Sequence, residues 1–156
     1  MNTEKLFRFN PFNIKEWNDS EIKEQYAILE SKLLFGDSPM ELSNDIDVYA
    51  NIAYLIGEMI ARYYEKVSIT ESKLKVNIAN TIYRERNDWM KSSSDKAPAM
   101  SYFENKANSM FLDEIQELAI MESNLKRFKY AYDSIELKGN ALKKKLDSLK
   151  FDLLNR

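Results

Sequence analysis

Two long stretches of this chain place apolar residues at alternating steps of three and four, and this spacing constrains the fold more than any other feature. The first stretch covers residues 46–74 and the second covers residues 115–153. Such steps keep apolar side chains on one face of an α-helix and are typical of helices that supercoil around each other. The first series is Ile46, Tyr49, Ala53, Ile56, Ile60, Tyr63, Val67, Thr70 and Leu74. The second is Ile115, Leu118, Met121, Leu125, Phe128, Tyr132, Ile135, Gly139, Leu142, Leu146, Leu149 and Leu153.

Turn-forming residues are scarce, with only 3 Gly and 3 Pro among 156 residues. Because β-sandwiches and barrels need many tight turns, the composition favours an all-α fold. A polar loop over residues 91–100 predicts a long antiparallel, coiled-coil-like helical hairpin over 41–156, with helices at about 44–90 and about 112–154. We expect Ser43, Asn44 or Asp45 to start the first long helix, and Ser101 to cap a short helix before the second.

Residues 1–40 are predicted to form a separate N-terminal region. It consists of an aromatic tail and an additional short helix that starts near Asn18 and ends at the turn residues 36–39. The tail clusters Phe7, Phe9, Phe12 and Trp17, which either pack back onto the helices or dock into a partner.

Apolar residues such as Ile52, Met59 and Ile120 flank the two series and widen the apolar stripe beyond what one partner helix covers. We therefore expect the chain to form a homo-oligomer through its helices. Gly139 stands where Leu would be expected, which leaves the close approach of another backbone and a tolerated kink as alternatives. The residues predicted to line the oligomer interface are Ile56, Ile60, Tyr63, Leu125, Phe128, Tyr132, Gly139, Leu142 and Leu146.

The chain contains neither histidine nor cysteine. Histidine is the commonest general base and metal ligand, and cysteine supplies thiolate nucleophiles and zinc sites. The sequence also lacks a glycine-rich phosphate loop and a catalytic triad. We therefore expect a binding protein that is not an enzyme and that uses no cofactor or metal, with carboxylate-only catalysis as the remaining enzymatic alternative.

Charge is distributed unevenly, although the formal net charge is only −2. Residues 123–156 carry nine basic and four acidic side chains, including the lysine triplet 143–145. Such asymmetry attracts polyanions or pairs unlike ends of neighbouring subunits, whereas the alternative is a solvated helix face.

Basic and aromatic residues alternate over residues 73–91, near the predicted loop. Cations neutralise phosphates and aromatic rings stack on bases, so this combination is typical of single-stranded nucleic acid binding. The predicted DNA-binding residues are Lys73, Lys75, Tyr83, Arg84, Arg86, Trp89 and Lys91. The basic C-terminal cluster is the alternative location for these contacts.

Three segments, namely residues 82–86 (IYRER), 102–113 (YFENKANSMFLD) and 134–151 (SIELKGNALKKKLDSLKF), resemble the phage recombination mediators of the UvsY-like family. The likeness covers roughly residues 45–151. The resemblance implies a small helical protein that forms ring-like homo-oligomers and binds single-stranded DNA. It further implies that the protein helps a RecA-like recombinase to displace a single-strand binding protein. Residues 79–81 are neutral where the family tends to be basic, which moves the expected contacts about one turn towards the loop.

The sequence leaves a second hypothesis, in which the chain is a structural coiled-coil adaptor or scaffold without a nucleic acid role. No apolar run reaches the roughly 20 residues that a membrane-spanning helix needs, and the first residues lack the form of a signal peptide. We therefore expect no membrane partner and a cytoplasmic location, in the host cytoplasm if a phage encodes the chain.

Overall fold

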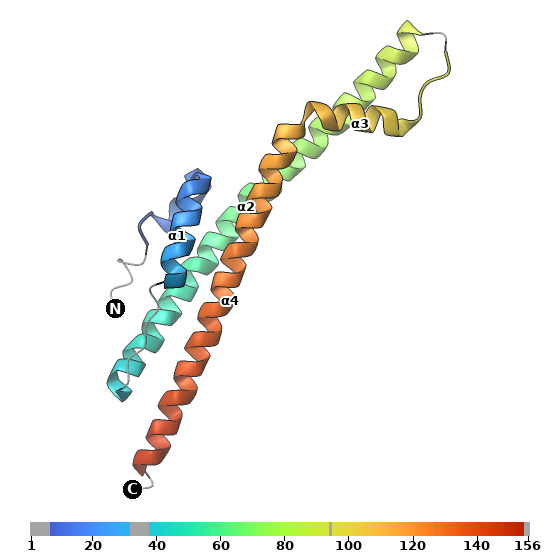
Figure 1. Ribbon diagram of the computed structural model, residues 1–156. Helices are drawn as coiled ribbons and strands as arrows, with labels where there is room; N and C mark the ends of the chain where they lie inside the picture. The colour runs from blue at the N-terminus through green and yellow to red at the C-terminus, as the bar shows by residue number, and fades with distance from the viewer. Residues whose placement is uncertain (1–6, 32–37, 94, 155–156) are drawn as a thin grey trace. The chain divides into compact units, whose positions relative to one another are not determined.

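The computed structural model describes residues 7–31, 38–93 and 95–154, and it contains helices and no strand within these residues. In chain order these are the 3-10 helix η2 (Pro11–Glu16) and the α-helices α1 (Asp19–Ser31), α2 (Pro39–Ser92), α3 (Met100–Met110) and α4 (Leu112–Leu154) (Figure 1). The all-α prediction is therefore confirmed. No helix within the described ranges is both long and apolar enough to cross a membrane.

Helix α2 starts at Pro39, earlier than the predicted start at Ser43, Asn44 or Asp45. The Ser38 hydroxyl accepts a hydrogen bond from the Glu41 N–H at 3.2 Å, and the Glu41 carboxylate accepts one from the Ser38 N–H at 3.1 Å. These two bonds form a capping box, and proline at the first helical position has a suitable fixed φ. The sequence analysis counted Pro39 among the turn residues that end the preceding helix, and that was wrong, because Pro39 is the first residue of α2. The predicted turn residues 36 and 37 lie outside the described residues.

Helices α1 and α3 differ in how they are capped. Asn18 caps α1, because its side-chain oxygen accepts from the Glu21 N–H at 3.0 Å while the Glu21 carboxylate accepts from the Asn18 N–H at 2.7 Å. Helix α3 begins at Met100 after Ala99, with no side-chain cap. The prediction that Ser101 caps this helix was wrong.

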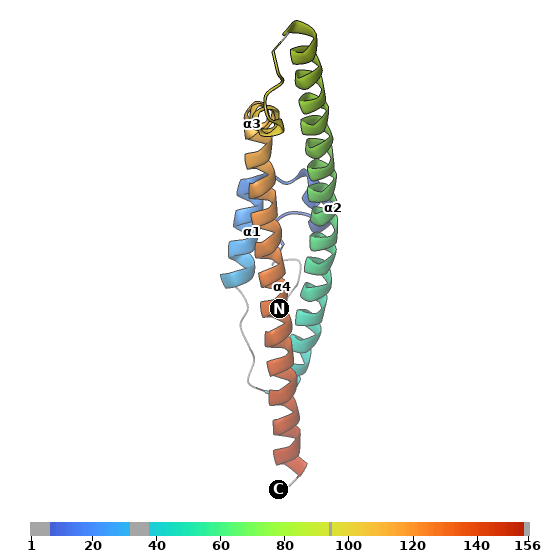
Figure 2. The same cartoon turned by 90° about the vertical axis from the view of Figure 1, so that its right-hand side faces the viewer.

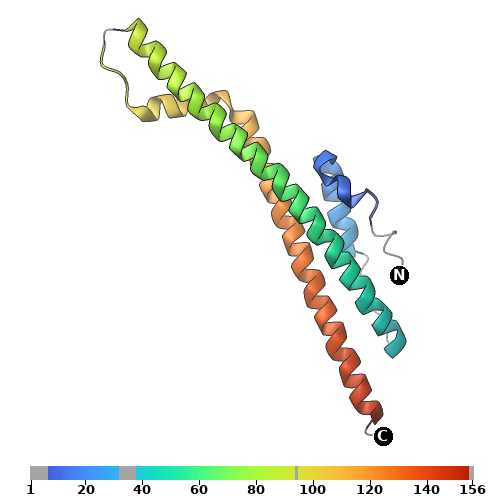
Figure 3. The same ribbon diagram turned by 180° about the vertical axis from the view of Figure 1, so that it is seen from behind.

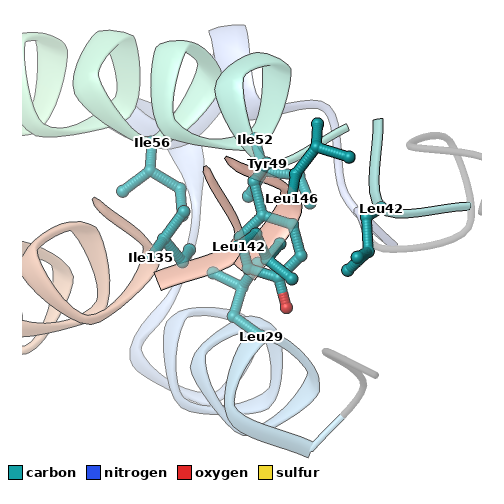
Figure 4. Packing of buried hydrophobic residues seen from close by; sticks show 8 residues of the cluster. All are labelled: Leu29, Leu42, Tyr49, Ile52, Ile56, Ile135, Leu142 and Leu146. Atoms are coloured by element: carbon teal, nitrogen blue, oxygen red, sulfur yellow. The ribbon is translucent and has the colours of Figure 1, made fainter. Parts of the chain in front are cut away.

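The chain divides into two compact units, and α2 and α4 each contribute to both. Unit 1 comprises residues 1–64 and 124–156, and unit 2 comprises residues 65–123. In unit 1, α1 is drawn next to α2 in Figure 1 and next to α4 in Figure 2. Leu29 of α1 joins residues of the two long helices in one buried cluster, drawn in Figure 4. The eight residues of this cluster are Leu29, Leu42, Tyr49, Ile52, Ile56, Ile135, Leu142 and Leu146.

Within unit 1, three contacts record how α2 and α4 pair. A Cβ built on Gly139 lies 3.8 Å from Tyr49 Cβ, and one built on Gly57 lies 3.7 Å from the Tyr132 ring. The rings of Tyr63 and Phe128 meet edge to face with their centroids 6.3 Å apart. Along this series of contacts, the residue numbers of α2 therefore rise as those of α4 fall.

The aromatic N-terminal residues pack within unit 1. Phe9 lies against Trp17 with ring centroids 5.5 Å apart, and the Arg62 guanidinium stands 5.3 Å from the centroid of the Phe12 ring. Ile14 and Trp17 are buried. Of the two alternatives for the tail, the structure shows packing onto the helices for the residues from Phe7 onwards.

Unit 2 has a smaller buried set, made of Val67, Leu74, Thr81, Phe103, Ala107 and Met121. The Trp89 ring of α2 meets the Tyr102 ring of α3 at 6.4 Å between centroids. Near it, the Lys106 ammonium of α3 forms an ion pair with the Glu85 carboxylate of α2. In Figure 3, α2 passes in front of α3 and of the beginning of α4.

Candidate nucleic-acid interface

All seven predicted DNA-binding residues lie on the part of α2 that belongs to unit 2. Six of them are exposed, namely Lys73, Lys75, Tyr83, Arg84, Arg86 and Lys91. Trp89 is half-buried, and its Nε1 is buried without a hydrogen-bond partner among the described residues. Because the indole packs against Tyr102, it is poorly placed to stack on a base.

The exposed cations follow two different lines along α2. Each residue of an α-helix advances by about 100°, so residues 7 or 11 apart share a line. Lys73, Arg84 and Lys91 share one line. Lys75 and Arg86 share a second line, roughly 160° around the helix. A strand that runs along α2 therefore meets the first three cations together, but not all five.

The local electrostatics favour the line of Lys73, Arg84 and Lys91. None of the ion pairs among the described residues involves these three side chains, whereas Lys75 pairs with Glu71 at 2.5 Å. Lys106 of α3 neutralises Glu85, which stands between Arg84 and Arg86. The hydrogen bond from Lys106 to the Glu85 carboxylate raises the pKa of the ammonium group, so Lys106 stays charged at neutral pH. Glu85, which adjoins both arginines in the sequence, is therefore already compensated.

The residues predicted to line an oligomer interface are used inside the single chain. Ile56, Tyr63, Leu125, Phe128, Leu142 and Leu146 are buried, while Ile60, Tyr132 and Gly139 are half-buried. Of the predicted flank residues, Ile52 and Met59 are fully buried as well, whereas Ile120 is 45% exposed. Ile52 shares its buried cluster with residues of α1 and α4 of the same chain. These two helices therefore cover the wide apolar stripe of α2 at this point without a second subunit.

The structure shows what lies nearest to Gly139 within the single chain. The nearest atom to a Cβ built at this position is the Tyr49 Cβ at 3.8 Å, which is an ordinary van der Waals distance. Among the described residues, no backbone approaches Gly139 so closely that a side chain is excluded.

A groove of about 420 Å³ lies beside Gly139 in unit 1, with Tyr49, Asp47, Glu136 and Lys143 on its walls. Burial, aided by the nearby Asp45 carboxylate, raises the pKa of Tyr49 to about 12. The hydroxyl therefore stays protonated at neutral pH, when it would be a poor general base. No cluster of three or more acidic, histidine or cysteine side chains occurs within the described parts of the chain.

Sequence reasoning missed a second apolar line on α2, which we call the outer line. It consists of Ile69, Val76, Tyr83 and Met90, each seven residues from the next. These side chains are 46%, 57%, 71% and 54% exposed. The strict heptad spacing was the signal that could have revealed them.

Comparison of the chain with family models, curated proteins and solved structures finds no match. The resemblance to the UvsY-like mediators therefore stays a prediction from the sequence.

Proposed function

We propose that this protein is a non-enzymatic recombination mediator that binds single-stranded DNA and self-associates through its helices. The observation that carries the proposal is the exposed cationic line of Lys73, Arg84 and Lys91 on α2, without a partner among the recorded ion pairs. Cations on one line of a rigid helix, here about 16.5 and 10.5 Å apart along its axis, contact separate phosphates of one strand. Trp89 packs against Tyr102, which leaves Tyr83, at 71% exposed, as the predicted aromatic residue that is free to stack on a base.

The order of contacts between α2 and α4 in unit 1 supports an antiparallel hairpin as the scaffold of this site. Copies of the hairpin would gather weak phosphate contacts from several subunits into one strong, salt-sensitive surface. By its resemblance to the mediator family, the assembly would help a RecA-like recombinase displace a single-strand binding protein. That step is tested by recombinase ATP hydrolysis on coated single strands, which we expect the protein to stimulate.

The DNA contact is tested by fluorescence anisotropy with labelled oligo-dT at several salt concentrations. We expect the double variant Arg84→Ala/Lys91→Ala to bind at least tenfold more weakly at low salt. The slope of the logarithm of the association constant against the logarithm of the salt concentration is negative. Its magnitude should decrease by about 1.4, because each phosphate contact to a single strand contributes about 0.7.

The matched control removes the same charge from the basic C-terminal cluster in the variant Lys144→Ala/Lys145→Ala. Both residues are exposed on α4. Near wild-type affinity is expected for this control. A larger loss of affinity in the control than in the α2 variant would place the DNA contact on α4. An equal loss of affinity in both variants would show that binding depends only on net charge.

A structural helical adaptor is the second candidate function, and the outer line is the observation that favours it. Exposed apolar residues aligned on one helix face commonly mark a protein interaction surface. This candidate predicts no salt-dependent affinity for single strands in the same anisotropy experiment.

A further inference from the structure

The outer line continues a seven-residue register that begins earlier on α2. In unit 1 the same register passes through Val48, Leu55 and Arg62, which are half-buried. There the N-terminal segment covers it: Phe12 lies over Arg62, and a groove lined by residues 7–12 contains Leu55. In unit 2 the register carries Ile69, Val76, Tyr83 and Met90, and these are exposed. One periodic surface is thus covered over its first half and bare over its second.

The residues between the members of the outer line are polar in a specific way. Four positions after Ile69, Val76 and Tyr83 come Lys73, Asn80 and Asn87. Steps of four and three place all seven side chains on one strip, with the apolar residues at one core position of a heptad and the polar residues at the other. The buried residues Val67, Leu74 and Thr81 lie on the opposite side of the helix, so the strip is separate from the packing of unit 2.

We propose that this strip pairs with the same strip of a second copy of the chain, as a parallel, in-register two-stranded coiled coil over residues 69–90. A parallel arrangement places each apolar residue against its own copy and gives four apolar layers. It also places Asn80 against Asn80 and Asn87 against Asn87, where each amide donates to and accepts from its twin. Asparagine or lysine at this heptad position fixes register and oligomeric state at a cost in stability, so the strip trades affinity for specific pairing.

An antiparallel arrangement of the same strips is less favourable. In an antiparallel pair, each layer combines one core position of the heptad in the first chain with the other core position in the second chain. Val76 or Tyr83 would therefore face asparagine or lysine. Each apolar residue would then lose its apolar partner, and each amide would lose the twin that satisfies it.

Pairing has a cost that connects it to the proposed function. Lys73 would face its own copy, and Arg86 would lie beside Lys91 of the second chain. Like charges at these positions oppose association at low salt and are screened as salt rises. A bound polyanion would remove the same repulsion, because the cationic lines of both chains run along the pair in the same direction. The inference rests on the proposed self-association but does not require that DNA binds.

Cysteine cross-linking tests the pairing directly, since the natural chain has no cysteine. The single variants Asn80→Cys and Lys73→Cys are each oxidised under mild conditions without DNA, at low salt and at 1 M salt. In a parallel pair both positions lie opposite themselves, within the Cα separation of about 4–7 Å that a disulfide needs. We expect both variants to form covalent dimers, with a higher yield at 1 M salt. The exposed α3 variant Asn105→Cys is the control and should remain uncrosslinked.

A charge substitution on the strip provides the second measurement. Val76→Asp/Tyr83→Asp alters two exposed side chains, so the helical circular dichroism should be unchanged while light scattering at 1 M salt falls from a dimeric to a monomeric mass. The matched variant Tyr54→Asp/Leu137→Asp changes two exposed apolar residues away from the strip and should keep the dimeric mass.

Three results would overturn the inference: no linkage through Asn80→Cys, linkage through Asn80→Cys without linkage through Lys73→Cys, or a dimeric mass for Val76→Asp/Tyr83→Asp. Because these measurements contain no DNA, failure of oligonucleotide binding leaves them interpretable, and the two proposals can fail separately.

Discussion

The two parts of α2 carry the same kind of heptad sequence but have different surroundings. From Pro39 to Tyr64 the helix belongs to unit 1, where α1, α4 and the aromatic N-terminal segment bury Tyr49, Ile52, Ile56, Met59 and Tyr63. From Glu65 to Ser92 it belongs to unit 2, where only Val67, Leu74 and Thr81 are buried and the outer line is exposed. The comparison teaches that one long helix supplies stability over one half and an accessible surface over the other.

The largest expected effect is the loss of a core ring from unit 1. Phe128 is fully buried and meets Tyr63 edge to face. Phe128→Ala should lower the free energy of unfolding by about 3–5 kcal/mol, because it removes apolar contacts and leaves a cavity. Urea denaturation followed by circular dichroism measures this loss. Tyr130→Ala, two residues further on and 67% exposed, should change the free energy by no more than about 0.5 kcal/mol. Similar losses for both variants would contradict the burial described for this part of α4.

A smaller effect is expected from the ionisation of Tyr49 in unit 1. Burial raises its pKa to about 12 from 10.0, so the folded state holds the phenolic proton more tightly than the unfolded state. This contribution is complete below pH 10 and is lost as the pH rises from 10 to 12. Over that window, wild type should lose on the order of 2 kcal/mol relative to Tyr49→Phe, which has no phenol to ionise. The other titrating groups are common to both proteins and cancel. Parallel alkaline unfolding curves for the two would show that Tyr49 is solvated in the folded chain.

Glycine substitutions give an effect of about 1 kcal/mol and compare the helical backbone of the two units. Built Cβ atoms at Gly57 and Gly139 meet their neighbours at 3.7 and 3.8 Å, so alanine fits at both positions of unit 1. Each Gly→Ala change should raise the free energy of unfolding by about 1 kcal/mol. The converse change Ala79→Gly, at an exposed position of α2 in unit 2, should lower it by about the same amount if the two units unfold together. A marked destabilisation by Gly139→Ala would show that a backbone approaches this glycine in the native assembly.

Much of the fold followed from the spacing of apolar residues, but the partners of those residues did not. The steps of three and four identified the faces of α2 and α4 that Tyr63 and Phe128 share, because helical periodicity is a local property. Coverage of Ile52 and Met59 was assigned to a second subunit, whereas α1 packs at this side of the cluster and both residues are buried in the single chain. Packing between distant segments depends on tertiary geometry, which a periodic pattern does not contain.

The candidate site was predictable in composition and less so in geometry. Arg84 and Lys91 were recognisable as cations near the end of a helix, and both are exposed. The pairing of Glu85 with Lys106, and the packing of Trp89 on Tyr102, depend on how α3 folds back within unit 2. Their sequence separation hides such contacts from a reading of α2 alone.

Hydrogen exchange measured by mass spectrometry, with and without oligo-dT at low salt, tests most directly whether the exposed half of α2 is the binding surface. We predict slower exchange for peptides within residues 66–92. Exchange should be unchanged for peptides within residues 41–64, because this half of α2 is already covered by the chain itself. Slower exchange confined to residues 123–154 of α4, or no change in any peptide when the strand is bound, would contradict this account.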